Sequence, residues 1–144
     1  MRYPFLIFLL FLSHLSFGQF QKIINQSIDI NDATKVQVDL KGQVSYQEWE
    51  GMFMLIETKV VIENCNENIF RSFVATGRYL IQADIDGEII KLKSHKSLGQ
   101  VVQSKLGETV ERVYVKIYYP KGFKDSSGNL LESTVEHEQI AGGK

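Results

Sequence analysis

The sequence predicts an all-β domain, mainly antiparallel, with one short α-helix. Two observations favour β structure: apolar and polar side chains alternate along most of the chain, and an Asp-Gly pair separates two such alternating runs. A third observation indicates the helix, because apolar spacing changes from two to three and four between residues 66 and 77. At 144 residues, the chain has room for a single domain.

The N-terminus is typical of a cleaved secretory signal peptide, to which we assign residues 1–18. It has a short basic start, an apolar core at residues 5–12, and the small residues Ser16 and Gly18 at the expected positions before a cleavage site. The apolar core would span about 12 Å as a helix, whereas a bilayer core needs about 30 Å, which disfavours a membrane anchor. We expect cleavage before Gln19, no transmembrane segment in the mature chain, and export to the periplasm or the cell surface.

The mature chain divides into a β-rich domain, residues 19–124, and a flexible tail, residues 125–144. Alternation predicts strands at residues 35–41, 44–49, 52–63, 79–85, 88–94 and 112–119. The run 52–63 carries apolar groups on both faces, which indicates a central strand. The tail lacks sustained periodicity, so we expect its deletion to lower the free energy of unfolding by about 1 kcal/mol or less.

Two local signals predict how the chain turns. The helix begins near asparagines that can cap it, and Gly77 stands where a left-handed C-terminal cap needs glycine. Asp86 and Gly87 predict a two-residue hairpin turn, which would place Ala83 opposite Ile90.

Composition argues against several classes of function. Lys and Arg number 16 and Asp and Glu 17, so the chain has no basic excess that would suggest nucleic acid. The single cysteine, Cys65, can form no intramolecular disulfide, and we expect its thiol to be buried. Cys65, His95 and His137 lack the spacing of a zinc motif or of a nucleophile with its base.

The acidic residues also lack a recognisable site pattern. Asp84, Asp86 and Glu88 could suggest calcium, but the sixth position of that loop would be Ile89 where an EF-hand needs glycine. The sequence therefore assigns no catalytic, cofactor-binding or metal-ligating residue.

Two groups of polar and aromatic side chains leave alternatives open. The first is a basic group: Lys91, Lys93, His95 and Lys96. It is either a solvated strand face, which we favour, or a weak polyanion site. The second group shares one face of the last strand: Tyr114, Lys116 and Tyr118. These side chains could stack on sugars or on a partner chain, or lie beneath a second layer, and we favour burial.

The order of strands and punctuating residues resembles the bacterial adhesin family of the head GIN-domain type. The resemblance covers roughly residues 30–123, and it rests on Lys35–Asp39, Gly42–Val44, Trp49, Ile56–Thr58, Gly77–Tyr79 and Tyr114–Pro120. In that family, the strand ending at proline leads into a β-solenoid shaft. The resemblance therefore implies a head without its shaft and supplies no catalytic residues.

From these observations we expect an exported, non-catalytic envelope or surface module with adhesin-like binding to an envelope protein or a glycan. One alternative is a small secreted hydrolase that would bring Glu57 or Glu63 beside Asp39. Another is a truncated, functionless relative of a longer adhesin-like protein. We also expect weak self-association through strand 112–119, if that strand ends the sheet as an open edge.

Overall fold

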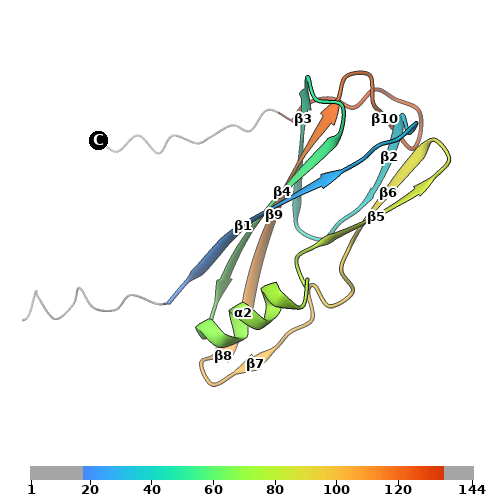
Figure 1. Ribbon diagram of the computed structural model, residues 1–144. Coiled ribbons are helices and arrows are strands. Elements are labelled where there is room, and N and C mark those ends of the chain that lie inside the picture. Colours follow the sequence, from blue (N-terminus) through green and yellow to red (C-terminus); the bar gives the residue numbers. More distant parts are fainter. Residues whose placement is uncertain (1–17, 135–144) are drawn as a thin grey trace, which may run out of the picture.

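A computed structural model describes residues 18–134 and shows the predicted mostly β fold (Figure 1). The elements in chain order are β1 (Phe20–Ile28), β2 (Lys35–Asp39), β3 (Gln43–Trp49), β4 (Met54–Glu63), α2 (Glu67–Ala75), β5 (Ile81–Asp86), β6 (Ile89–Ser94), β7 (Gln103–Ser104), β8 (Gly107–Glu108), β9 (Val110–Pro120) and β10 (Lys124–Asp125). The all-β class with one short helix is confirmed.

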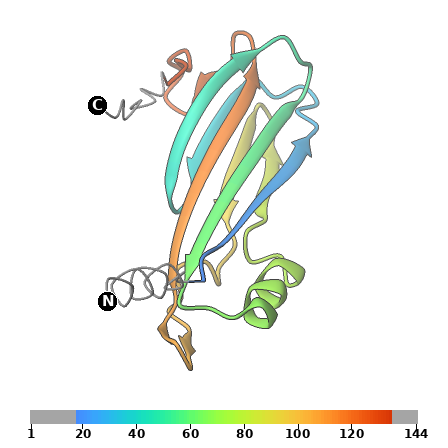
Figure 2. The same cartoon turned by 90° about the vertical axis from the view of Figure 1, so that its left-hand side faces the viewer.

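The strands form two four-stranded sheets and one small hairpin. Sheet A has the order β1-β4-β9-β3, sheet B has the order β10-β2-β6-β5, and β7 pairs with β8. Four strand pairs are antiparallel, and three are parallel: β3 with β9, β2 with β6, and β10 with β2. The two large sheets lie one behind the other, with α2 near one end (Figure 2).

The core lies between the sheets and follows the alternation of the sequence. Alternate residues of the two central strands of sheet A are buried: Met54, Ile56, Val60 and Ile62 of β4, with Val113, Val115, Ile117 and Tyr119 of β9. Sheet B contributes Val36, Ile90 and Leu92 to the same cluster. The intervening residues of β4 and β9 point to the opposite side of sheet A, because successive strand residues face opposite ways.

The predicted helix is confirmed, with both of its end signals. The Asn66 side chain accepts a hydrogen bond from the Ile69 backbone N–H at 2.9 Å, which caps the first turn. Gly77 has φ +72°, the left-handed conformation expected after the C-terminus. Phe70 is buried and stacks on Phe20 of β1, with ring centroids 5.6 Å apart.

The predicted register of the hairpin at Asp86 and Gly87, formed by β5 and β6, is wrong by two residues. Ala83 pairs with Leu92 and not with Ile90, and the turn consists of Gly87 and Glu88. Gly87, at φ +59°, takes the first central position of the turn, as glycine does in a type II′ hairpin. A shift of two residues keeps each side chain on the same face, so the apolar pairing survives.

Strand 112–119 is not an edge, which corrects the basis of the expected self-association. The corresponding strand, β9, lies between β4 and β3, and Ile117 is paired with Ile56 on one side and with Tyr46 on the other. Its backbone therefore offers no unpaired row within residues 18–134. The edges of sheet A are β1 and β3.

The chain remains ordered past residue 124, where the tail was expected to begin. The Leu131 N–H donates to the Phe123 carbonyl at 3.0 Å, and the buried Tyr119 hydroxyl donates to the Leu131 carbonyl at 2.9 Å. The Thr134 N–H donates to the Tyr46 carbonyl at 2.8 Å, on the outer edge of β3. Residues 125–134 thus belong to the folded unit. The signal segment up to residue 17, and residues 135–144, lie outside the described residues.

Replacing Thr58 by valine is expected to stabilise the protein. Thr58 is 1% exposed within sheet A, and its hydroxyl has no hydrogen-bond partner among residues 18–134. Valine has nearly the same shape and removes this buried unpaired group, so the free energy of unfolding should rise by about 1 kcal/mol. Urea denaturation measures the change. Thr76→Val is the control, because the exposed Thr76 hydroxyl donates to the Ser72 carbonyl; a gain of similar size there would contradict the explanation.

Candidate binding surface

The candidate site is the side of sheet A that points away from the core, which we call the outer face. Its side chains come from all four strands: Ile23 and Asn25 of β1, Leu55, Glu57 and Lys59 of β4, Tyr114, Lys116 and Tyr118 of β9, and Ser45, Gln47 and Trp49 of β3. Figure 2 looks onto these strands, and no described helix or strand crosses them. Within residues 18–134, no helix or strand therefore covers the middle of the outer face.

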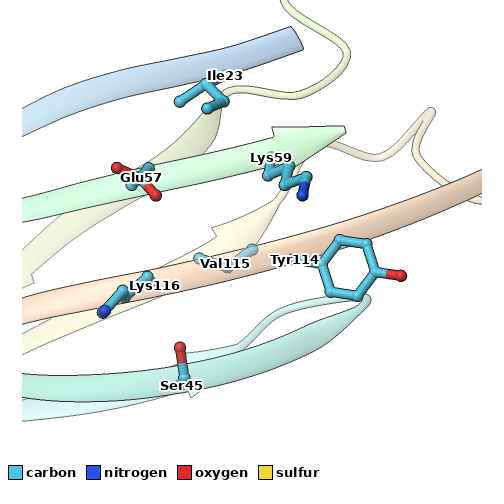
Figure 3. A pocket seen from close by; sticks show the side chains of 7 residues that line it. All are labelled: Ile23, Ser45, Glu57, Lys59, Tyr114, Val115 and Lys116. Atoms are coloured by element: carbon cyan, nitrogen blue, oxygen red, sulfur yellow. The ribbon is translucent and has the colours of Figure 1, made fainter. Parts of the chain in front are cut away.

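A shallow groove of about 370 Å³ lies at the centre of the outer face. Its lining residues are Ile23, Ser45, Glu57, Lys59, Tyr114, Val115 and Lys116 (Figure 3). Glu57 lies directly across the β4–β9 pair from Lys116, and Lys59 lies across from Tyr114. Among residues 18–134, no ion pair within 4.0 Å involves Glu57, Lys59 or Lys116. The groove thus presents two ammonium groups and one carboxylate.

An aromatic cluster adjoins the groove where β3 and β9 end. The Trp49 ring packs edge-on against Phe53, with centroids 4.8 Å apart, and lies 6.2 Å from the ring of Tyr118. The indole N–H donates to the Phe53 carbonyl at 3.0 Å. A Cβ atom added at Gly51 would clash with the Trp49 ring as it lies here, so this arrangement needs glycine in the turn. These contacts connect the three rings of the aromatic cluster.

One group of side chains predicted from the sequence lies together on the outer face, but it is more exposed than expected. Tyr114, Lys116 and Tyr118 share a face, as predicted, but Tyr114 is 37% exposed and the expected burial under a second layer is wrong. Trp49 and Glu57 lie beside this group on the outer face, although no local sequence pattern connects them with it. Alternation along the sequence indicates on which face of its strand Trp49 lies. It does not indicate that β3 pairs in parallel with β9, which brings Trp49 to the same face as Tyr118.

Lys91 and Lys93 form a solvated face of β6, as the sequence analysis favours for the basic group, whereas His95 and Lys96 lie beyond this strand, which ends at Ser94. Lys91 forms an ion pair with Asp86 at 2.6 Å, and Lys93 lies opposite Asp39 in the strand register. Glu88 pairs with Lys35 at 3.5 Å. The two ion pairs give Asp86 and Glu88 cationic partners and reduce the positive charge that this strand face offers to a polyanion.

Cys65 is buried, and His95 lies in a local turn. Cys65 is 2% exposed, and burial raises the pKa of its thiol, which disfavours the nucleophilic thiolate. His95 Nδ1 lies 2.6 Å from the Ser97 hydroxyl within a local turn. His137 lies outside the described residues. Within residues 18–134, no group of three or more His, Cys, Asp or Glu side chains could hold a metal ion.

The carboxylates of the hydrolase alternative are not brought together. Glu57 lies on the outer face, and Glu63, six residues along the same strand, forms an ion pair with Arg112. Asp39 ends β2 in sheet B, opposite Lys93. The structure therefore does not place either glutamate beside Asp39, as the hydrolase alternative requires; glycoside hydrolysis uses two carboxyl groups about 5–10 Å apart.

A buried ion pair anchors the segment after the helix. Arg78 and Glu111 make two hydrogen bonds of 2.8 Å, and the Tyr79 hydroxyl donates to the same carboxylate at 2.7 Å. Arg78 also donates to the Gln100 carbonyl at 2.7 Å. The hydrogen bond to Glu111 raises the pKa of Arg78, while burial and then Glu111 raise the pKa of Tyr79. These groups satisfy one another, which indicates a structural role.

In the described part of the chain, no helix has the length and apolar character needed to cross a membrane.

Comparison with known proteins gives two distant structural similarities. No family model and no curated protein matches the sequence. A crystal structure of a "putative adhesin" from Parabacteroides merdae is 13% identical, with a TM-score of 0.31, over 72% of this chain and 33% of that one. Another "putative adhesin", from Bacteroides fragilis, is 15% identical, with a TM-score of 0.31, over 72% of this chain and 42% of that one.

This chain therefore spans less than half the length of either protein. A TM-score of 0.31 is too low for the similarity to decide fold or function. The head GIN-domain type stays a prediction.

Proposed function

We propose that this chain is an exported, non-catalytic module of the bacterial envelope or cell surface that binds a partner through the outer face of sheet A. The observation that carries this proposal is the groove, which no helix or strand among residues 18–134 covers, together with its neighbouring aromatic cluster. Aromatic rings provide contact area at little cost in conformational entropy, and exposed aromatic side chains beside polar groups are typical of recognition surfaces. The predicted signal peptide supports export.

The composition of the groove favours binding over catalysis. Among the described residues that line it, Glu57 is the one carboxylate, and Lys59 and Lys116 stand on the neighbouring positions. Acid–base hydrolysis by carboxyl groups needs a second carboxyl at a defined distance. The groove is also shallow and open, whereas reactions that exclude water use enclosed sites.

Binding to the native envelope tests the proposal. The mature chain is expected to bind saturably to the envelope fraction of the bacterium that produces it. The double substitution Tyr114→Ala with Lys116→Ala should weaken binding at least about tenfold, because it removes an exposed aromatic and a cation from the groove. Sedimentation of labelled protein with envelopes measures the affinity.

The matched control is Lys105→Ala with Leu106→Ala, on the exposed turn between β7 and β8. It removes the same kinds of group, a cation and a large apolar side chain, and should leave the affinity unchanged. Equal affinities for both double variants would refute the proposed surface. An absence of saturable binding would favour the functionless alternative.

A further inference from the structure

We infer, on the basis of the proposed function, that the partner bound by the outer face is an acidic polysaccharide, a chain of sugar rings that carry carboxylates. The inference joins two observations on the same surface. Aromatic rings are spaced along one strand, and two ammonium groups without ion-pair partners in the described chain lie between and beside them.

The aromatic rings suit an extended ligand. Tyr114 and Tyr118 are four residues apart on the same face of β9, which corresponds to about 13 Å along the strand. Trp49 and Phe53 continue the aromatic surface beyond Tyr118. The apolar C–H faces of sugar rings can pack on such side chains, as other apolar groups do. Several rings in a row need a ligand of several sugar units.

The polar side chains suit hydroxyl and carboxylate groups. Ser45 and Gln47 on β3 and Asn25 on β1 flank the aromatic rows and can exchange hydrogen bonds with sugar hydroxyls. Lys116 lies midway between Tyr114 and Tyr118, with its ammonium group 5.3 Å from the Tyr118 ring centroid. A cation at this position can pair with a carboxylate on a sugar stacked beside it.

The charge balance of the groove favours an anionic ligand over a neutral one. Lys59 and Lys116 together exceed the single negative charge of Glu57, and no ion pair within 4.0 Å engages either lysine among residues 18–134. Arg112, the next cation along β9, is already paired with Glu63. Glu57 should therefore oppose ligand binding electrostatically while the two lysines favour it.

Tryptophan fluorescence provides a direct test, because Trp49 is the only tryptophan and belongs to the aromatic cluster. The mature chain is titrated with β-1,4-linked hexamannuronate, with neutral β-1,4-linked mannohexaose, and with polyphosphate. Hexamannuronate should bind at least about tenfold more tightly than either of the other two. Polyphosphate supplies charge without rings, and mannohexaose supplies rings without charge.

Substitutions in the groove should change affinity in opposite directions. Lys59→Gln and Lys116→Gln should each weaken hexamannuronate binding about threefold, the effect of one partly exposed ion pair. Glu57→Gln should strengthen hexamannuronate binding by a similar factor, and it should not strengthen mannohexaose binding. Lys105→Gln, on the β7–β8 turn, is the matched control and should have no effect. Circular dichroism checks that each variant is folded.

Several outcomes would overturn the inference: no response to hexamannuronate up to its solubility limit, equal affinity for mannohexaose or polyphosphate, or weaker binding in Glu57→Gln. Envelope binding separates this failure from failure of the proposed function. If that binding resists periodate oxidation of glycans, disappears after protease treatment, and still needs Tyr114 and Lys116, the outer face binds a protein. The proposed function would then stand and the inference would fall.

Discussion

Replacing Glu111 by glutamine is expected to lower the free energy of unfolding by about 3 kcal/mol, because it leaves a buried guanidinium without its counter-ion. Arg78 is 4% exposed. The two hydrogen bonds between its guanidinium and the Glu111 carboxylate are therefore shielded from bulk water. The Tyr79 hydroxyl loses its charged acceptor in the same substitution. For a domain of this size, the melting temperature should fall by about 10 °C.

Glu67→Gln is the matched control, since Glu67 forms an exposed ion pair with Arg71 one turn along α2. That pair should contribute about 0.5 kcal/mol or less. Chemical denaturation of both variants gives the comparison. A loss below about 1 kcal/mol for Glu111→Gln would show that the buried pair does not hold the segment after the helix against β9.

Truncation after residue 124 is expected to be far more destabilising than truncation after residue 134. The longer deletion removes Leu131, which packs against the core, and leaves the buried hydroxyl of Tyr119 without its acceptor. Together these losses should reduce the free energy of unfolding by about 3 kcal/mol. Because both variants lack residues 135–144, the difference between them reports on residues 125–134 alone.

The same deletion should also expose the edge of β3. In the folded chain, the Tyr46 N–H donates to the Thr134 hydroxyl and the Glu48 N–H donates to the Ser133 hydroxyl. An unpaired strand edge invites another strand, so the shorter chain should form dimers at high concentration while the chain ending at residue 134 should not. Light scattering would detect them. Equal stability of the two truncated chains would restore the tail boundary expected from the sequence.

Local patterns predicted most of the elements but not their order in the sheets. The helix from Asn66 and the buried face of β4 follow from spacing and capping signals within a few residues. Strand β1 was missed because Ile23 and Ile24 are adjacent, and the polar Gln26 takes an inward position there. Its side chain bonds to both backbone groups of Ile81 in sheet B. Such a contact spans 55 residues, so no local pattern can reveal it.

Only part of the candidate site can be predicted from the sequence, because local patterns do not reveal contacts between distant strands. Tyr114, Lys116 and Tyr118 share a face because strand residues alternate, and that was visible in the sequence. Trp49 joins them because β3 runs parallel to β9, with Ser45 opposite Lys116, and Glu57 joins them through the antiparallel pairing with β4. Both pairings depend on the packing of the whole sheet.

Lysine footprinting of the protein bound to its native envelope tests the central claim most directly. Envelope-bound protein and free protein are acetylated under the same conditions, and modification at each lysine is compared by mass spectrometry. If the outer face of sheet A is the binding surface, Lys59 and Lys116 should be protected in the bound state, while Lys93 of sheet B and Lys105 of the β7–β8 turn should react equally in both states. Protection of Lys93 or Lys105, with Lys59 and Lys116 fully reactive, would contradict the account.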